Sequence, residues 1–197
     1  MEYYKRVTWG NLPIKELLAA LVIPDTTQAI VRPISLPIQH LIFRWLKIDL
    51  EKCSAFNIML VYFPPGSQIN IHSDMPPSEP EGMRIQQGVI LPLENCDNLT
   101  WAWFEPTDPA AIFYKGESNS WKTVPMLPRA SANLVASTVC DKPFISDIGT
   151  FHALKNSSDK PAIAISIRLM PWSYNTVQDS SELPPIDNFT ICNTTST

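Results

Sequence analysis

Apolar positions in the N-terminal fifth of the chain recur at helical spacing. The segment Lys15 to Leu21 shows this pattern; Asn11 can cap a helix there, Pro13 falls in its first turn, and Pro24-Asp25 closes it. A second helix is predicted from about Pro37 to about Leu50, with these apolar residues near helical spacing on one side: Ile38, Leu41, Ile42, Trp45, Leu46 and Ile48. Both helices are expected to pack against a sheet.

After Cys53 the pattern changes to alternation with period two and to short apolar runs. Strands are predicted at 56–63 and 68–74, and then at about 84–92, 99–104, 110–114, 120–124, 133–138, 143–147, 150–154 and 162–169. The 19 Pro against 6 Gly fit short strands joined by loops, because Pro interrupts helices but is tolerated at strand edges and in turns. Many short strands at this spacing predict a mainly β sandwich or barrel.

The chain is predicted to form one domain over residues 1–197. Its 197 residues, 45% of them apolar, are enough to bury a full core. Within that domain we expect a helical N-terminal part (1–52), a β core (53–172) and a polar tail (173–197) that is loosely ordered or laid over the surface.

Charge and cysteine spacing exclude several classes of function. The 15 Lys and Arg against 19 Asp and Glu give no broad basic surface for nucleic acid, although a local groove stays open. No apolar run is long enough to span a bilayer, and the N-terminus lacks the apolar centre of a signal peptide, so we expect a cytoplasmic protein with no membrane partner. The four Cys form no Cys-x-x-Cys pair and are expected to be reduced thiols.

The stretch His72-Ser73-Asp74 carries the strongest chemical signal. Alternation along an extended chain puts His72 and Asp74 on one face, where an imidazole and a carboxylate can hold one metal ion. His152 is the candidate for a second His that completes a two-His, one-carboxylate triad with open metal positions. The alternatives are a polar strand end for the pair and a core histidine satisfied by a backbone carbonyl for His152. His40, on the predicted second helix, is interpreted as structural or solvent-facing.

Two further stretches bear on a binding site. Residues 75–82 contain three Pro and a Gly directly after the candidate ligands, so they cannot be regular structure and are placed to form a rim or lid. The stretch Thr100 to Phe104 carries Trp101 and Trp103, with Trp121 beyond it. These aromatics either line a substrate groove or belong to the core or the sheet surface.

Three blocks, covering about residues 56–171, resemble the Fe(II)- and 2-oxoglutarate-dependent oxygenases. The blocks are Tyr62 to Gly66 leading to His72-Ser73-Asp74, then Met83 to Cys96, and then Phe151 to Ser158 with the following strand Ala162 to Leu169. In the third block an Asn stands four residues after His152, as in that family. The chain looks most like small phage and bacterial members related to aspartyl/asparaginyl and prolyl hydroxylases. The resemblance implies a double-stranded β-helix (jelly roll) in which His72, Asp74 and His152 hold Fe(II), with 2-oxoglutarate as cosubstrate.

The resemblance also implies a basic residue on the final strand that pairs with the far carboxylate of 2-oxoglutarate. At the family's usual spacing of about nine to eleven residues after the distal His, this chain has Pro161, Ala162 and Ile163. The candidate is therefore Arg168, which lies sixteen residues after His152. Alternation places it on one face with Ala162, Ala164 and Ser166.

A permanently charged guanidinium in a half-buried strand needs an anionic partner, which a dicarboxylate would provide. The alternative for Arg168 is a structural ion pair or a surface position. Lys160 and Arg84 are lesser candidates for the same role. Four polar residues on strands predicted to line the cavity either help to hold the cosubstrate or are ordinary strand residues: Tyr62, Asn70, Gln86 and Ser166.

The leading functional hypothesis is thus a 2-oxoglutarate-dependent dioxygenase, a hydroxylase acting on a peptidyl residue or a small molecule. One alternative is a non-catalytic jelly-roll binding or structural protein, for example of a virus particle. Another is a cupin-like metalloenzyme that does not use 2-oxoglutarate. Jelly rolls host unrelated functions, so the fold alone does not separate these hypotheses. A phage-encoded protein would be found in the host cytoplasm or the virion.

Overall fold

The computed structural model describes residues 3–8, 13–45, 56–74, 87–116, 123–169 and 190–191. Its helices are α1 (Ile14–Ala20) and α2 (Leu36–Trp45). Its strands are β1 (Tyr4–Thr8), β2 (Ile30–Pro33), β3 (Phe56–Phe63), β4 (Gln87–Glu94), β5 (Leu99–Pro106), β6 (Phe113–Gly116), β7 (Thr123–Met126), β8 (Ala132–Val139), β9 (Phe144–Asp147), β10 (Phe151–Asn156), β11 (Ala162–Leu169) and β12 (Thr190–Ile191). None of the helices in these ranges has the length and apolar character needed to cross a membrane.

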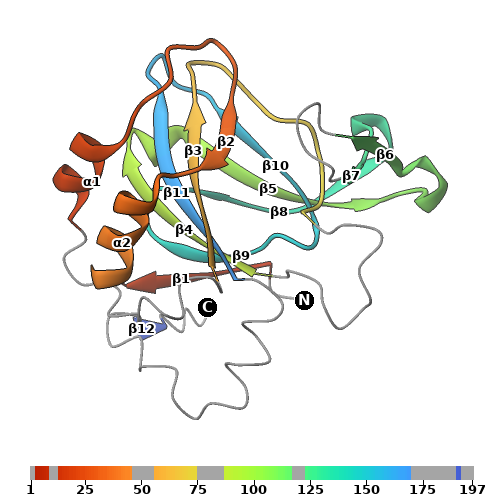
Figure 1. Cartoon of the computed structure of the whole chain (residues 1–197). Helices are drawn as coiled ribbons and strands as arrows, with labels where there is room; N and C mark the ends of the chain where they lie inside the picture. Colours follow the sequence, from red (N-terminus) through yellow and green to blue (C-terminus); the bar gives the residue numbers. More distant parts are fainter. Residues whose placement is uncertain are drawn as a thin grey trace.

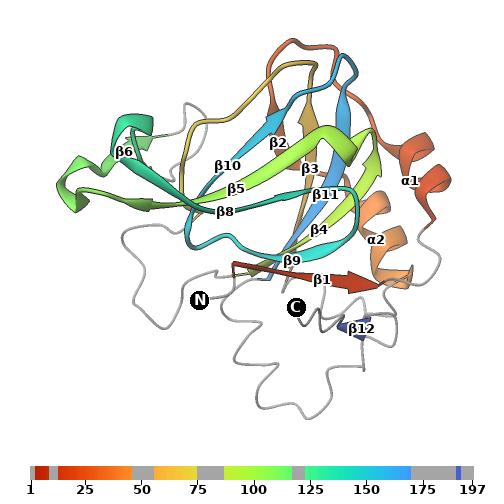
Figure 2. The ribbon, with the colours of Figure 1, turned by 180° about the vertical axis from the view of Figure 1, so that it is seen from behind.

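Two antiparallel sheets form the body of the molecule (Figures 1 and 2). The larger sheet has the order β12-β1-β9-β4-β11-β3-β2, and the smaller has the order β10-β5-β8. Strands β6 and β7 pair as a hairpin that lies beyond the ends of β5 and β8. This arrangement confirms the predicted fold class, a mainly β jelly roll with N-terminal packing helices.

Strand β11 separates two cores by alternation. Its Ile163, Ile165 and Ile167 belong to a cluster with residues of both helices, including Leu17 and Ile42, on the outer face of the larger sheet. Its Ala162 and Ala164 belong to the other cluster, between the sheets, which contains aromatic residues of β5 and β9. The helices therefore cover one face of the sheet, as Figure 1 shows, while the opposite face lines the interior of the jelly roll.

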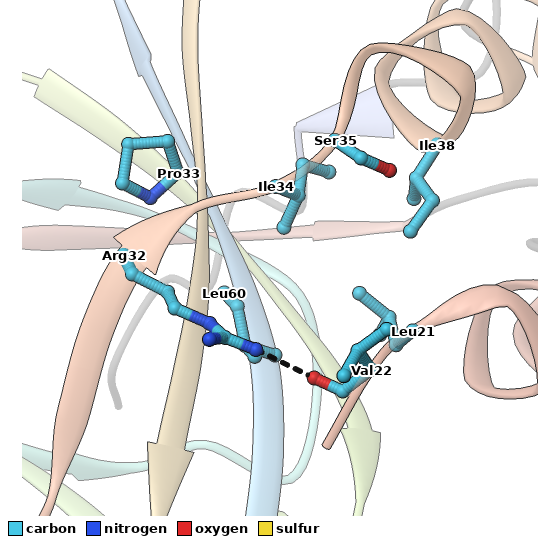
Figure 3. Close-up of a pocket in the computed structure, with 8 residues that line it drawn as sticks. All are labelled: Leu21, Val22, Arg32, Pro33, Ile34, Ser35, Ile38 and Leu60. Carbon is cyan, nitrogen blue, oxygen red and sulfur yellow. Dashed lines mark hydrogen bonds between the residues drawn. The ribbon is translucent and has the colours of Figure 1, made fainter. Parts of the chain in front are cut away.

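A hollow on the helix-covered face lies between α1, β2 and α2 (Figure 3). It is lined by Leu21, Val22, Arg32, Pro33, Ile34, Ser35, Ile38 and Leu60. The Arg32 guanidinium donates a hydrogen bond of 2.8 Å to the carbonyl oxygen of Val22 across it. Four of the lining residues, Leu21, Ile34, Ile38 and Leu60, belong to the helix-side core. The hollow is therefore separate from the interior of the jelly roll.

Most predicted elements are present, with shifted ends. The strand predicted at 162–169 coincides with β11, and both predicted helices form at α1 and α2. The segment predicted as a strand at 68–74 is instead an extended loop with isolated bridges at Gln68 and His72. The N-terminal part, predicted to be helical, also contributes β1 and β2 to the larger sheet. The single-domain assignment stays a prediction.

Several sequence-based expectations lie outside the described residues. These concern Asn11, the loop 75–82, Arg84, Gln86, Trp121, Cys53, Cys192 and nearly all of the tail 173–197. The tail residues Thr190 and Ile191 form β12 and pair with β1. The other two cysteines, Cys96 and Cys140, are free and buried.

Asn156 ties the end of β10 to the rest of the fold. It is fully buried, and its Nδ2 group donates to the carbonyl oxygens of Phe63 at 2.9 Å and Lys160 at 2.7 Å. Its Oδ1 accepts from the backbone N–H of Ser158 at 3.0 Å. Buried polar groups that lose their partners are costly, so this amide has a structural role.

We expect Asn156→Ala to lower the free energy of unfolding by about 3 kcal/mol, because it leaves buried carbonyl groups without donors. Urea denaturation followed by circular dichroism would measure the change. Ser157→Ala is the matched control, since the Ser157 side chain is exposed one residue further along. An effect below about 1 kcal/mol for Asn156→Ala would contradict the structural role.

Candidate metal centre

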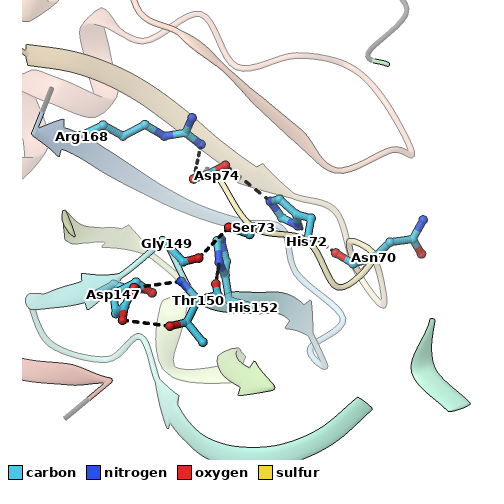
Figure 4. Close-up of polar contacts among 10 residues, drawn as sticks. Asn70, His72, Ser73, Asp74, Asp147, Gly149, Thr150, His152 and Arg168 are labelled. Atoms are coloured by element: carbon cyan, nitrogen blue, oxygen red, sulfur yellow. Dashed lines mark hydrogen bonds and ion pairs between the residues drawn. The ribbon is translucent and has the colours of Figure 1, made fainter. Parts of the chain in front are cut away.

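Backbone pairing brings His72 and His152 together. The N–H of His72 donates to the carbonyl oxygen of His152 at 3.0 Å, and the N–H of His152 donates back to His72 at 2.7 Å. Nearby, the N–H of Ile69 donates to the carbonyl oxygen of Leu154 at 3.0 Å. The loop that carries His72 is therefore attached to β10 at two points, and the imidazole rings lie 4.6 Å apart between centroids (Figure 4).

Both imidazoles are held in the same tautomer by backbone carbonyl groups. The Nδ1 of His72 lies 2.9 Å from the carbonyl oxygen of Asn70, and the Nδ1 of His152 lies 2.9 Å from that of Thr150. A carbonyl oxygen can only accept, so each Nδ1 carries a proton, and Nε2 is the ring nitrogen that can offer a lone pair. This is the arrangement that orients a histidine as a metal ligand.

Asp74 completes the group. Its backbone N–H donates to the carbonyl oxygen of Ile148 at 3.1 Å, and its Oδ1 lies 3.8 Å from the Nε2 of His72. The potential ligand atoms of His72, Asp74 and His152 all lie within 4.8 Å of one another. Two imidazole nitrogens and one carboxylate oxygen suit a divalent transition metal, so these residues fit such an ion.

Two side chains fix the loops that present the ligands. Ser73 is buried, and its Oγ donates to the carbonyl oxygen of Gly149 at 2.6 Å. The Asp147 carboxylate accepts from both the N–H and the Oγ1 of Thr150, each at 2.9 Å. The Ser73 bond connects the loop around His72 with the turn that leads into His152, and the Asp147 bonds stabilise that turn (Figure 4). Sequence reasoning missed both, although Ser73 lies inside the motif itself.

His152 is buried against an indole ring. It is 2% exposed, and its imidazole stacks on Trp101 at 5.2 Å between centroids and 18° between planes. Burial, the largest cause, and the neighbouring His72 together lower the pKa of His152 to about 4, while Asp74 opposes the shift. His152 is therefore neutral near pH 7, the form in which imidazole binds a metal.

Arg168 reaches the same site from β11. Its Nη2 lies 3.0 Å from Oδ2 of Asp74, and the two side chains are 18% and 10% exposed. The sequence left open whether this residue is an ion-pair partner or a cosubstrate ligand, and the structure contains the ion pair. Its Nε is buried without a hydrogen-bond partner in the described part of the chain, and so is the Nε1 of Trp101.

The other predicted cosubstrate residues are placed differently. Ser166 is buried on the interior face of β11, two residues before Arg168. Strand β3 is buried on both faces, and Tyr62 packs in the core under the helices. Its side chain therefore points away from the interior of the jelly roll, and the structure does not bring it to the site. Asn70 contributes its backbone carbonyl to His72 while its side chain is exposed, and Lys160 is exposed as well.

The tryptophans of β5 belong to the core. Trp103 is fully buried, and its Nε1 donates to the carbonyl oxygen of Asp147 at 2.8 Å. Trp101 is 3% exposed and packs in the same interior cluster. Of the two interpretations that the sequence allowed for this stretch, the structure thus supports core packing rather than an open groove.

Comparison with known proteins gives similarity of fold only. No protein-family model and no curated protein matches the sequence. Among solved structures, oxalate oxidase in complex with the substrate analogue glycolate aligns over 78% of this chain at 12% identity and a TM-score of 0.41. The alignment spans 57% of the oxalate oxidase chain.

Two bacterial structures are also similar. A cupin domain from Bordetella pertussis aligns over 75% of this chain and 98% of its own, at 15% identity and a TM-score of 0.32. A protein with a double-stranded β-helix domain from Klebsiella pneumoniae aligns over 82% and 90%, at 12% identity and a TM-score of 0.34. Similarity at this level does not bear on function, which has to be argued from the site.

We expect His152→Ala to weaken Co(II) binding by more than about 100-fold, because it removes one of three metal-binding atoms. Losing an outer partner of a metal ligand has a smaller effect, about 10- to 100-fold. Isothermal titration of the apoprotein with Co(II) would measure this. His40→Gln is the matched control, since His40 is the third histidine of the chain and lies in α2. Equal Co(II) affinity in the wild type and the His152→Ala variant would remove His152 from the site.

Proposed function

We propose that this protein is a mononuclear non-haem iron oxygenase in which His72, Asp74 and His152 hold Fe(II) and 2-oxoglutarate is the cosubstrate. The observation that carries the proposal is the convergence of these three side chains, with the Nδ1 of each histidine paired with a backbone carbonyl oxygen. Two imidazoles and one carboxylate on one side of an ion form the facial triad typical of such oxygenases.

The chain's own residues support this assignment in three ways. The backbone pair between His72 and His152 fixes the spacing of two ligands, and Ser73 and Asp147 restrain the loops that carry them. The burial of His152 beneath Trp101 excludes water from one side of the site. When bound, Fe(II) would supply open coordination positions for O2 and for an oxygen-bearing organic ligand.

Two unpartnered donors favour an acidic, oxygen-rich ligand. The Nε of Arg168 and the Nε1 of Trp101 are buried, and native structures rarely leave such groups unsatisfied unless a ligand or water serves them. Arg168 contacts Asp74, and Trp101 stacks on His152. Each donor therefore belongs to a residue that touches one of the proposed metal-binding residues. An acidic ligand such as 2-oxoglutarate would offer acceptors to buried donors of this kind. The expected reaction is hydroxylation of a peptidyl residue or a small molecule.

The second candidate is a cupin-like metalloenzyme that uses the same triad without 2-oxoglutarate. The Arg168–Asp74 ion pair favours this candidate, because a guanidinium already paired with a metal ligand has less capacity for a second carboxylate. Both candidates require the metal, and they differ only in the organic ligand.

Anaerobic titration of Fe(II)-loaded protein with 2-oxoglutarate tests the first candidate. We expect the weak visible charge-transfer band of the chelate to appear in the wild type and in His40→Gln. The band should be lost in His72→Ala, which removes one of the iron ligands.

The other outcomes identify the alternatives. Bound iron without a band on adding 2-oxoglutarate would reject that cosubstrate and favour the cupin-like enzyme. Absence of any metal binding would reject both enzymes and favour a non-catalytic jelly-roll module.

A further inference from the structure

The two carboxylate oxygens of Asp74 face different cations. Oδ1 lies on the side of the triad, 3.8 Å from the Nε2 of His72, whereas Oδ2 lies 3.0 Å from Nη2 of Arg168. Figure 4 shows this division, with Arg168 and His72 approaching Asp74 from opposite sides. A free carboxylate can bind a metal through one oxygen or through both. An ion pair at Oδ2 restricts that choice.

The Arg168 charge is permanent and close to the ligands. A guanidinium is not deprotonated in proteins, so it stays cationic whether or not a metal is present. Its attraction for Asp74 is only weakly screened, because the two side chains are 18% and 10% exposed. Without a metal, Arg168 therefore compensates the Asp74 charge; with a divalent ion present, two cations share one carboxylate.

We propose that Arg168 is a positioning residue that reserves Oδ2 of Asp74, limits this carboxylate to one metal-binding oxygen and so keeps a coordination position open for an outside ligand. The inference rests on the metal site of the proposed function, but not on 2-oxoglutarate. It gives Arg168 a role that lowers metal affinity, since the guanidinium repels the ion and withholds a donor atom. An ordinary outer partner of a metal ligand has the opposite effect on metal affinity, because its loss weakens metal binding.

Co(II) titration of the apoprotein, without any cosubstrate, tests the inference. Arg168→Met is expected to bind Co(II) about 10-fold more tightly than the wild type. Removing an outer partner of a metal ligand usually changes metal affinity by about this factor, but in the direction of weaker binding. The visible spectrum of bound Co(II), which reports coordination, should also change as Oδ2 of Asp74 loses its ion pair with Arg168. Arg168→Gln, which is neutral but keeps a donor, is the second variant if Arg168→Met does not fold, and it is expected to tighten binding as well.

A double-mutant cycle shows whether Arg168 acts through Asp74. In an Asp74→Asn background, Arg168→Met should change Co(II) affinity less than in the wild type, because the competition for the carboxylate has been removed. Arg6→Met is the matched control, because Arg6 also forms an ion pair with an aspartate, Asp141, at 2.8 Å. Neither residue belongs to the candidate site, so this substitution should leave Co(II) affinity unchanged. Arg168→Lys, which keeps the charge, should stay near the wild-type affinity.

The outcomes separate this inference from the proposed function. A 10-fold or greater loss of Co(II) affinity in Arg168→Met would overturn the inference and make Arg168 a supporting partner of Asp74. Unchanged affinity and spectrum would also overturn it, while leaving the iron oxygenase in place. A wild-type protein that binds Co(II) but not 2-oxoglutarate would reject the proposed cosubstrate and leave the inference standing. A wild type that binds no Co(II) would overturn both.

Discussion

The reciprocal backbone hydrogen bonds between His72 and His152 are the contact on which the candidate site depends. At 3.0 and 2.7 Å they attach an irregular loop to a regular strand, and they set the spacing of two imidazoles. The loop needs this attachment because isolated bridges, rather than a continuous ladder, hold it in place. The carbonyl partners of each Nδ1 and the bond from the Asp74 N–H to the carbonyl oxygen of Ile148 add to this attachment.

Strand β11 connects the site to the rest of the fold. The isoleucines on one face of the strand pack under the helices. Ala164, Ser166 and Arg168 lie on the other face, which is the interior side. The small residues leave room for the bulky aromatic residues of β5 and β9 between the sheets. The helices thus hold the strand from outside, and Arg168 reaches Asp74 from a strand that is buried along nearly its whole length.

Sequence patterns predicted the regular elements well and the contacts poorly. Strand β11 was predicted with its bounds because isoleucines occupy every second position along it, at 163, 165 and 167. His72, Asp74 and His152, which the structure brings together, were candidates from the sequence. Strands β1 and β2 were missed because they are short, and their partners β9 and β3 lie far away in sequence. Tyr62 was assigned to the interior because β3 is apolar on both faces, and such a strand gives no sign of which face lines the site. The partner of Arg168 depends on the path of the 68–74 loop, which alternation alone does not describe.

The edges of the larger sheet bear on how the molecule behaves at high concentration. An edge strand exposes unpaired backbone groups that another chain can use to extend the sheet. Here one edge is β12, which has two residues, and the other is β2, which has four and ends at Pro33. Short edges and a residue without an N–H group are features that hinder such pairing. The described edges of the larger sheet are thereby poor templates for intermolecular β association.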